Sequence, residues 1–85
     1  MKTHTGGDII VEEIKVGDIQ WEIDYDLALK VEVLSLPQLK DNQYTWKSKS
    51  VSNGKLIDYL VTIGHSHYAP KLYPSNIYSA KKLWL

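Results

Sequence analysis

Residues 19–26 alternate strictly between apolar and polar side chains, and this pattern most constrains the fold of the chain. A two-residue repeat is the period of a β-strand and excludes an amphipathic helix, whose period is 3.6 residues. We therefore predict a strand with one buried face and one solvated face. The predicted buried face carries Ile19, Trp21, Ile23 and Tyr25, and the predicted wet face carries Gln20, Glu22, Asp24 and Asp26.

Three further segments, 27–33, 44–49 and 57–63, repeat this alternation and are predicted to be strands. Few residues separate the first of them from the strand at 19–26, so we expect an antiparallel hairpin near Asp26 and Leu27 or, alternatively, one bent continuous ribbon. Asn53-Gly54 predicts a tight turn between the last two strands, because this pair accepts positive φ angles.

The remaining segments complete the predicted domain organisation. Residues 1–7 contain two adjacent glycines and are expected to be a flexible lead-in, followed by a single domain over 8–85. Residues 9–14 are predicted to form a short, bent strand. Residues 37–43 and the segment after Gly64 are predicted to be loops. Residues 75–85 fit either a short helix or a final strand.

The length and composition bound what such a chain can be. With 85 residues it has room for one small core, and without cysteine it has neither a disulfide nor a thiolate zinc site. Apolar residues make up 44% and charged residues 24%, which are ordinary globular values. Short strands at even spacing in a chain of this size favour a mainly β fold. We predict a small antiparallel barrel of about five strands.

The stretch Lys15-Val16-Gly17-Asp18-Ile19-Gln20-Trp21 resembles the opening of SH3-like barrels of the KOW and Tudor kind. It is also similar to small barrel proteins carried by bacteriophages. The chain departs from KOW domains in lacking their later glycine and basic residues, and from Tudor domains in lacking a cage of four aromatic residues. The resemblance implies an SH3-like barrel that acts as a binding module rather than as an enzyme.

The charged residues argue against a nucleic-acid binder. Ten Lys and Arg balance ten Asp and Glu, and all ten basic residues are lysines. A neutral chain without arginine lacks both the electrostatic footprint and the bidentate donors that nucleic-acid recognition uses. Richness in Lys, Ile, Asn and Tyr is also typical of AT-rich coding sequences.

No apolar stretch is long enough to span a bilayer or to serve as a signal peptide. We therefore expect a cytoplasmic protein, in the host cytoplasm if the source is viral.

The aromatic residues provide the functional hint. The chain has six Tyr, three Trp and no Phe, so every ring carries a polar group that suits a binding surface. Trp21, Tyr25 and Tyr59 share strand faces with aliphatic residues and are assigned to the core. The aromatic residues after Gly64 fit two roles: they form a binding surface, or they cover the open end of the barrel. The predicted binding residues are Tyr44, Trp46, His65, His67, Tyr68, Tyr73, Tyr78 and Trp84.

His65-Ser66-His67 is the one constellation with possible metal chemistry. Two histidines two residues apart on an extended chain face the same side and suit a shared metal ion. The interpretation that we favour is two loop histidines that hydrogen-bond backbone or water, because no helical His-Glu-x-x-His spacing and no second His pair supports a metal site. No catalytic motif and no phosphate-binding glycine loop occurs, so we predict neither a metal nor a cofactor, and no enzymatic activity.

Two functions fit this sequence. The first is a non-enzymatic binding protein that docks on a partner through the aromatic C-terminal half, such as a phage accessory or counter-defence protein that inhibits a host protein. The second is a homo-oligomeric protein that sequesters a nucleotide-like small molecule. In that case aromatic rings stack on the base while lysines and loop amides hold the phosphates.

Overall fold

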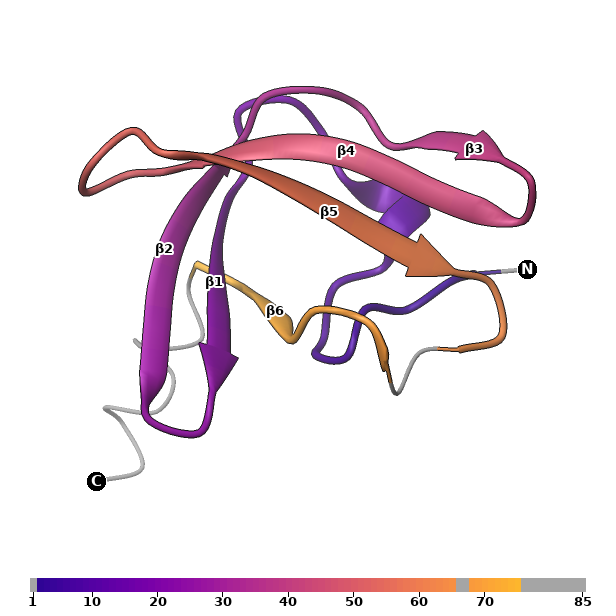
Figure 1. Cartoon of the computed structure of the whole chain (residues 1–85), viewed down its shortest axis with the longest axis horizontal. Helices are drawn as coiled ribbons and strands as arrows, with labels where there is room; N and C mark the ends of the chain where they lie inside the picture. The colour runs from indigo at the N-terminus through magenta and orange to yellow at the C-terminus, as the bar shows by residue number, and fades with distance from the viewer. Residues whose placement is uncertain (1, 66–67, 76–85) are drawn as a thin grey trace.

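The computed structural model describes residues 2–65 and 68–75, which form one antiparallel sheet of six strands (Figure 1). The mainly β, antiparallel fold is thereby confirmed. The choice between a C-terminal helix and a strand falls on residues 76–85, outside the described part of the chain. A single 3-10 turn, η1 (Val11–Glu13), precedes the strands. The strands are β1 (Ile19–Asp24), β2 (Leu27–Val33), β3 (Gln38–Lys40), β4 (Gln43–Ser50), β5 (Leu56–Thr62) and β6 (Leu72–Pro74).

Strand β4 is the centre of the sheet. Strand β5 pairs along one of its edges, while β3 and β2 share the other edge at opposite ends of β4. Strand β2 continues the sheet to β1, and β1 pairs with β6. The short strand β3 lies where a loop over 37–43 was predicted. It forms because Gln38–Lys40 pairs with the start of β4, a long-range contact that this polar sequence does not indicate.

Both predicted hairpins are confirmed, although the turn of the second is longer than the tight Asn53-Gly54 turn that was predicted, because Ser50 is the residue that bonds to Lys55 across it. Asp24 pairs with Leu27, so Tyr25 and Asp26 form a two-residue turn, with Tyr25 at a φ of 50°. The β4–β5 hairpin turns through Asn53-Gly54, and Gly54 takes the positive φ angle, 72°. Glycine adopts this angle without the steric cost that a Cβ atom imposes.

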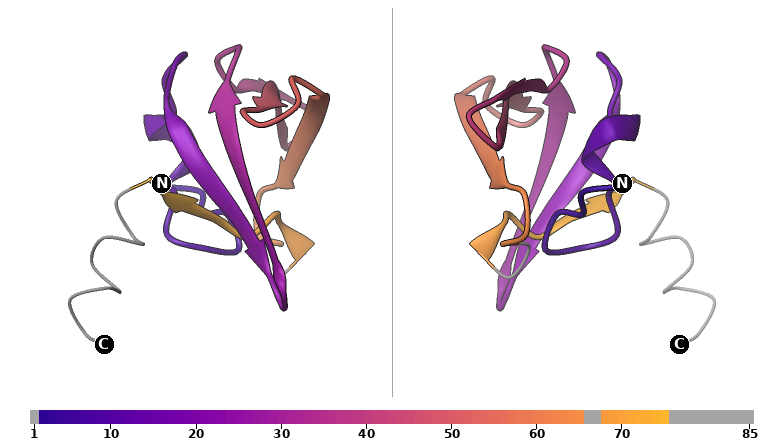
Figure 2. Two further views of the ribbon diagram at one scale, coloured as in Figure 1. Left: turned by 90° about the vertical axis from the view of Figure 1, so that its left-hand side faces the viewer. Right: turned by 90° about the vertical axis from the view of Figure 1, so that its right-hand side faces the viewer.

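The sheet bends so that β5 lies across the interior from β1 (Figure 2). The Tyr59 hydroxyl on β5 donates a hydrogen bond of 2.7 Å to the Glu22 carboxylate on β1, two strands that are not neighbours in the sheet. This contact satisfies the polar end of a ring that is 5% exposed. The core between the strands consists of Val11, Ile14, Val31, Val33, Trp46, Tyr59, Val61, Ala69 and Leu72.

Strand β1 presents the opposite face to the core from the one predicted. Gln20 is 2% exposed, whereas Tyr25, assigned to the core from the sequence, is 96% exposed at the hairpin turn. Cross-strand partners share a face, and Gln20 pairs with the fully buried Val31 of β2. Trp21 therefore lies on the outer face, half-buried, with the Lys30 ammonium 5.9 Å from its ring.

The N-terminal residues are bound into the domain, in contrast to the predicted flexible lead-in. Thr5 is 2% exposed. The Gly6 amide donates to the Pro70 carbonyl at 2.9 Å, and the Asp8 amide donates to the Leu72 carbonyl at 3.0 Å. The predicted strand over 9–14 is also wrong, since η1 occupies its middle. The hydrogen bonds from the Gly6 and Asp8 amides to the 70–72 segment fix the conformation of the N-terminal residues.

Glu12 of η1 connects this turn to the N-terminal segment and gives a pH-dependent prediction. Its carboxylate accepts the Thr3 amide at 2.7 Å. Desolvation alone raises the pKa of Glu12, but hydrogen bonds from Thr3 and the Tyr44 hydroxyl outweigh it and lower the pKa to about 2. Because this lies below the ordinary value of 4.5, ionised Glu12 stabilises the fold fully above about pH 4.5.

We expect this stabilisation to disappear as the pH falls from about 4.5 towards 2. Urea unfolding of the wild type and Glu12→Gln across this range measures it. The wild type should be more stable at neutral pH by less than about 1 kcal/mol, because the exposed carboxylate is screened by solvent. The difference should vanish near pH 2, and Asp26→Asn serves as the control. A difference that does not change with pH would contradict this role of Glu12.

Candidate functional site

The two aromatic residues predicted on β4 face the interior of the sheet. Trp46 is 3% exposed and packs against Tyr59 with ring centroids 5.6 Å apart. Its ring therefore belongs to the core and also lines a hollow described below, so its role in binding stays a prediction. Tyr44 is half-buried, and a hydrogen bond between its hydroxyl and the Glu12 carboxylate raises the pKa of Tyr44. Tyr44 thus serves to hold η1 on the sheet.

The other predicted residues separate into different parts of the molecule. Tyr73 lies on β6, half-buried and opposite Trp21 of β1, which places it on the outer face of a different part of the sheet. His67, Tyr78 and Trp84 lie outside the described residues. His65 and Tyr68 are the predicted pair that the structure brings together.

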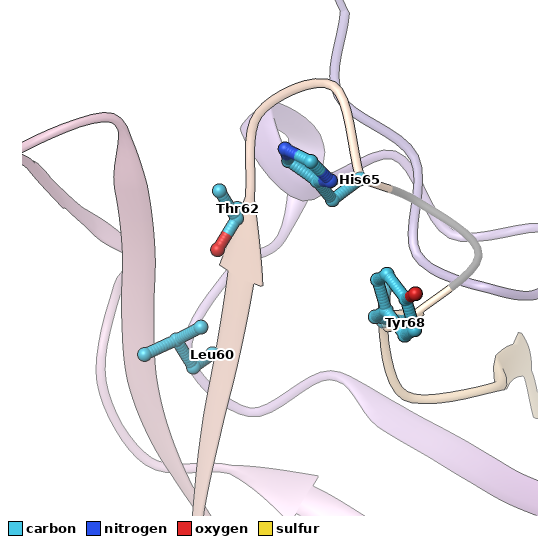
Figure 3. Close-up of a pocket in the computed structure, with 5 residues that line it drawn as sticks. Leu60, Thr62, His65 and Tyr68 are labelled. Atoms are coloured by element: carbon cyan, nitrogen blue, oxygen red, sulfur yellow. The ribbon is translucent and has the colours of Figure 1, made fainter.

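His65 and Tyr68 flank a hollow of about 290 Å³ beside the end of β5, here called the Tyr68 hollow (Figure 3). Tyr68 is 80% exposed, and its ring is stacked on His65 with centroids 6.4 Å apart. A local hydrogen bond of 3.1 Å from the Tyr68 amide to the His65 carbonyl brings the two residues together. The described residues that line the hollow are Leu60, Thr62, His65, Tyr68 and Ala69.

A second hollow of about 370 Å³ adjoins the first at Leu60, which lines both. It is lined by residues of β3, β4 and β5, with the buried Trp46 and Tyr59 among them, and is bordered by the exposed Lys47–Asp58 ion pair, whose atoms are 3.1 Å apart. The two hollows form a continuous surface along β5, here called the β5 surface. The second hollow is lined by Ser35, Gln38, Thr45, Trp46, Lys47, Asp58, Tyr59 and Leu60.

Leu60 is an exposed apolar residue of this surface that the sequence-based prediction of binding residues did not include. Its side chain is 47% exposed because it alternates with the buried Tyr59 and Val61. The signal was present in the sequence, since a leucine at the outward position of a strand is an apolar side chain on the wet face. The role of Leu60 in the site depends on the loop after β5, which brings Tyr68 to the same hollow.

Strand β5 also has an unpaired edge within the described structure. It pairs with β4, and between described residues no second strand pairs with its other edge, where the His65 amide donates to the Thr62 carbonyl at 3.0 Å and closes the turn after the strand. Natural proteins often protect such edges with lysine, proline or a bulge. The seven residues of β5 contain neither lysine nor proline, and Leu56 is 64% exposed. The edge is therefore chemically able to accept another strand.

Among the residues that the structure describes, no cluster of three or more His, Cys, Asp or Glu is arranged to hold a metal ion. Desolvation raises the pKa of Tyr59 far above its ordinary value, and its hydrogen bond to Glu22 acts in the same direction. A phenol held protonated in this way supports the fold.

Within the described segments no helix is both long and apolar enough to cross a membrane.

Comparisons of the chain with protein families, with curated proteins and with solved structures found no match. The function is therefore argued from the residues of this chain.

Proposed function

We propose that this chain is a non-enzymatic protein-binding module whose partner docks on the β5 surface. The observation that carries the proposal is a strand that pairs with a neighbour along one edge only among the described residues, and whose exposed leucines lead to a hollow flanked by an 80% exposed tyrosine. A partner segment can pair with the β5 backbone while its side chains contact Leu60 and Tyr68. Backbone pairing supplies affinity in this binding mode, and side-chain pockets supply specificity.

Tyr68 and Leu60 have the chemistry of interface anchors. Tyrosine offers a large amphipathic contact area with few rotatable bonds and is enriched among residues that dominate binding energy. Leu60 adds apolar area at the junction of the two hollows. The Lys47–Asp58 pair lies beside them, as the polar rim of an interface does.

The Tyr68 hollow favours a protein over a nucleotide. Nucleotide binding would require cations near the aromatic rings, and no lysine is among the described residues that line the Tyr68 hollow. Its volume of about 290 Å³ is also at the lower end of the roughly 300–1,000 Å³ typical of small-molecule sites. An SH3-like classification, a phage origin and inhibition of a host protein remain predictions from the sequence.

Affinity capture from an extract of the source organism tests the proposal. The tagged wild type should recover a specific protein, and Leu60→Lys and Tyr68→Ala should each reduce its recovery by about tenfold, as for central interface residues. Leu39→Lys on β3 is the matched control for the first variant, since Leu39 is 56% exposed. Tyr25→Ala is the matched control for the second.

Circular dichroism should show that all four variants remain folded, because the substituted side chains are exposed. Equal recovery by the wild type, the site variants and the controls would reject the β5 surface as the docking site. Recovery of no specific protein, together with a nucleotide retained in native mass spectrometry, would instead favour the sequestering function.

A further inference from the structure

A third hollow, with a different chemistry, lies on another part of the molecule, between the N-terminal segment, the start of β1 and the end of β6. Its volume is about 210 Å³, and it is here called the acidic hollow. Figure 2 shows η1 and the N-terminal segment beside β1. The residues that line it are Asp8, Ile9, Ile10, Glu13, Ile14, Asp18, Gln20 and Pro74.

Three carboxylates surround this hollow. Asp8 and Glu13 are exposed, and Asp18 is half-buried. The Asp18 carboxylate accepts the Lys15 amide at 2.9 Å, which leaves its charge in place because an amide carries no net charge. Glu13 already binds an ammonium group, since Lys2 Nζ lies 2.7 Å from its carboxylate. The three carboxylates therefore carry more negative charge than the single Lys2 ammonium group can neutralise.

Gln20 supplies an independent indication of a ligand. The residue lines the hollow and is 2% exposed, and its Oε1 has no hydrogen-bond partner. A buried amide oxygen without a partner costs roughly 1–3 kcal/mol, so such groups generally have a donor. The terminal torsion of a glutamine is broad, which allows the amide to turn towards a donor in the hollow.

The remaining lining residues are aliphatic. Ile14 is 4% exposed, and Ile9, Ile10 and Pro74 are half-buried. An apolar wall below a carboxylate rim matches a ligand with a hydrocarbon stem and a cationic end, as lysine side chains have. The carboxylates are not arranged as a metal site, so an organic cation fits better than a divalent ion.

We propose that the acidic hollow binds an alkylammonium group, with its stem on the isoleucines and its N–H donors on Gln20 and the carboxylates. The same chemistry is offered by a lysine side chain of a partner and by a free amine. The site does not depend on the β5 surface, because Leu60 and Tyr68 line neither its wall nor its rim.

NMR titration of the ¹⁵N-labelled protein with n-butylammonium chloride tests the proposal, with 1-butanol and sodium chloride as matched controls. Such a small ligand should bind with a Kd on the order of 10 mM. It should shift the amides of Asp8, Ile10 and Gln20 and the Gln20 side-chain amide. Neither control should do so. Equal shifts with 1-butanol, or no shifts at all, would overturn the proposal and leave water as the partner of Gln20.

Two variants test the role of charge. Asp8→Asn should raise the Kd about threefold, whereas Asp26→Asn at the distant β1–β2 turn should leave it unchanged. Lys2→Met should lower the Kd about twofold, because it releases Glu13 from its present ion pair. Identical Kd values for Asp8→Asn and the wild type would contradict the proposal.

The two sources of the ligand are distinguished by a blocked Gly-Lys-Gly peptide in a parallel titration. Tighter binding of the peptide than of butylammonium supports a lysine side chain of a partner, and weaker binding supports a free amine.

Discussion

Trp46→Ala is expected to lower the free energy of unfolding by about 3–5 kcal/mol, the usual cost of removing a buried tryptophan side chain. Trp46 is 3% exposed, and its ring packs against Tyr59 at the centre of the core. A domain of 85 residues typically has a stability of roughly 4–13 kcal/mol. The substitution therefore removes a large share of it, and urea unfolding followed by circular dichroism should show the loss.

Trp46→Phe separates the cavity from the polar group of the indole. The Trp46 Nε1 group is buried without a hydrogen-bond partner, so phenylalanine removes an unsatisfied donor and retains most of the volume. We expect Trp46→Phe to cost roughly 1 kcal/mol. Tyr25→Ala, at a ring that is 96% exposed, should cost little. A small loss of stability in Trp46→Ala, together with loss of partner binding, would show that Trp46 belongs to a binding surface after all.

Gly7→Ala is the second substitution for which we expect a large loss of stability, about 3 kcal/mol, at the upper end of the usual cost of overpacking. A Cβ atom at Gly7 would overlap the Leu72 carbonyl oxygen and lie 3.0 Å from Cζ of Tyr73. The first neighbour is backbone, so it cannot rotate away. Relief requires the N-terminal segment to move off β6, which breaks the 3.0 Å hydrogen bond from the Asp8 amide to Leu72.

Hydrogen exchange tests this mechanism along with thermal unfolding. The Gly6 and Asp8 amides should lose protection in Gly7→Ala, because both donate to the 70–72 segment. Gly17→Ala is the control, since its φ of 91° carries backbone strain while no atom lies within 4 Å of the added Cβ. It should cost about 1 kcal/mol. If the two alanine variants lose the same stability, the close approach of Gly7 to β6 is not what restricts this position to glycine.

The candidate sites divide into what local patterns predict and what they do not. The loop after Gly64 was predicted to bind a partner because of its aromatic residues, and Tyr68 is 80% exposed there, while the binding role itself stays a prediction. Its neighbour Leu60 became significant through tertiary contact alone. The acidic hollow combines Asp8, Asp18 and Pro74, which are far apart in the chain and share no motif.

The alternation of residues 19–33 determined that these segments are strands, because a period of two is a local property of the backbone, and the short connection between them favoured an antiparallel hairpin. It did not determine which face of β1 is buried. Antiparallel pairing places Gln20 beside Val31 and Trp21 beside Lys30, and the buried valines of β2 then direct Gln20 inward. The pairing of β1 with β2 thus outweighs the hydrophobic pattern of β1 itself. Because this pairing is a contact between strands, only the tertiary structure decided which face of β1 is buried.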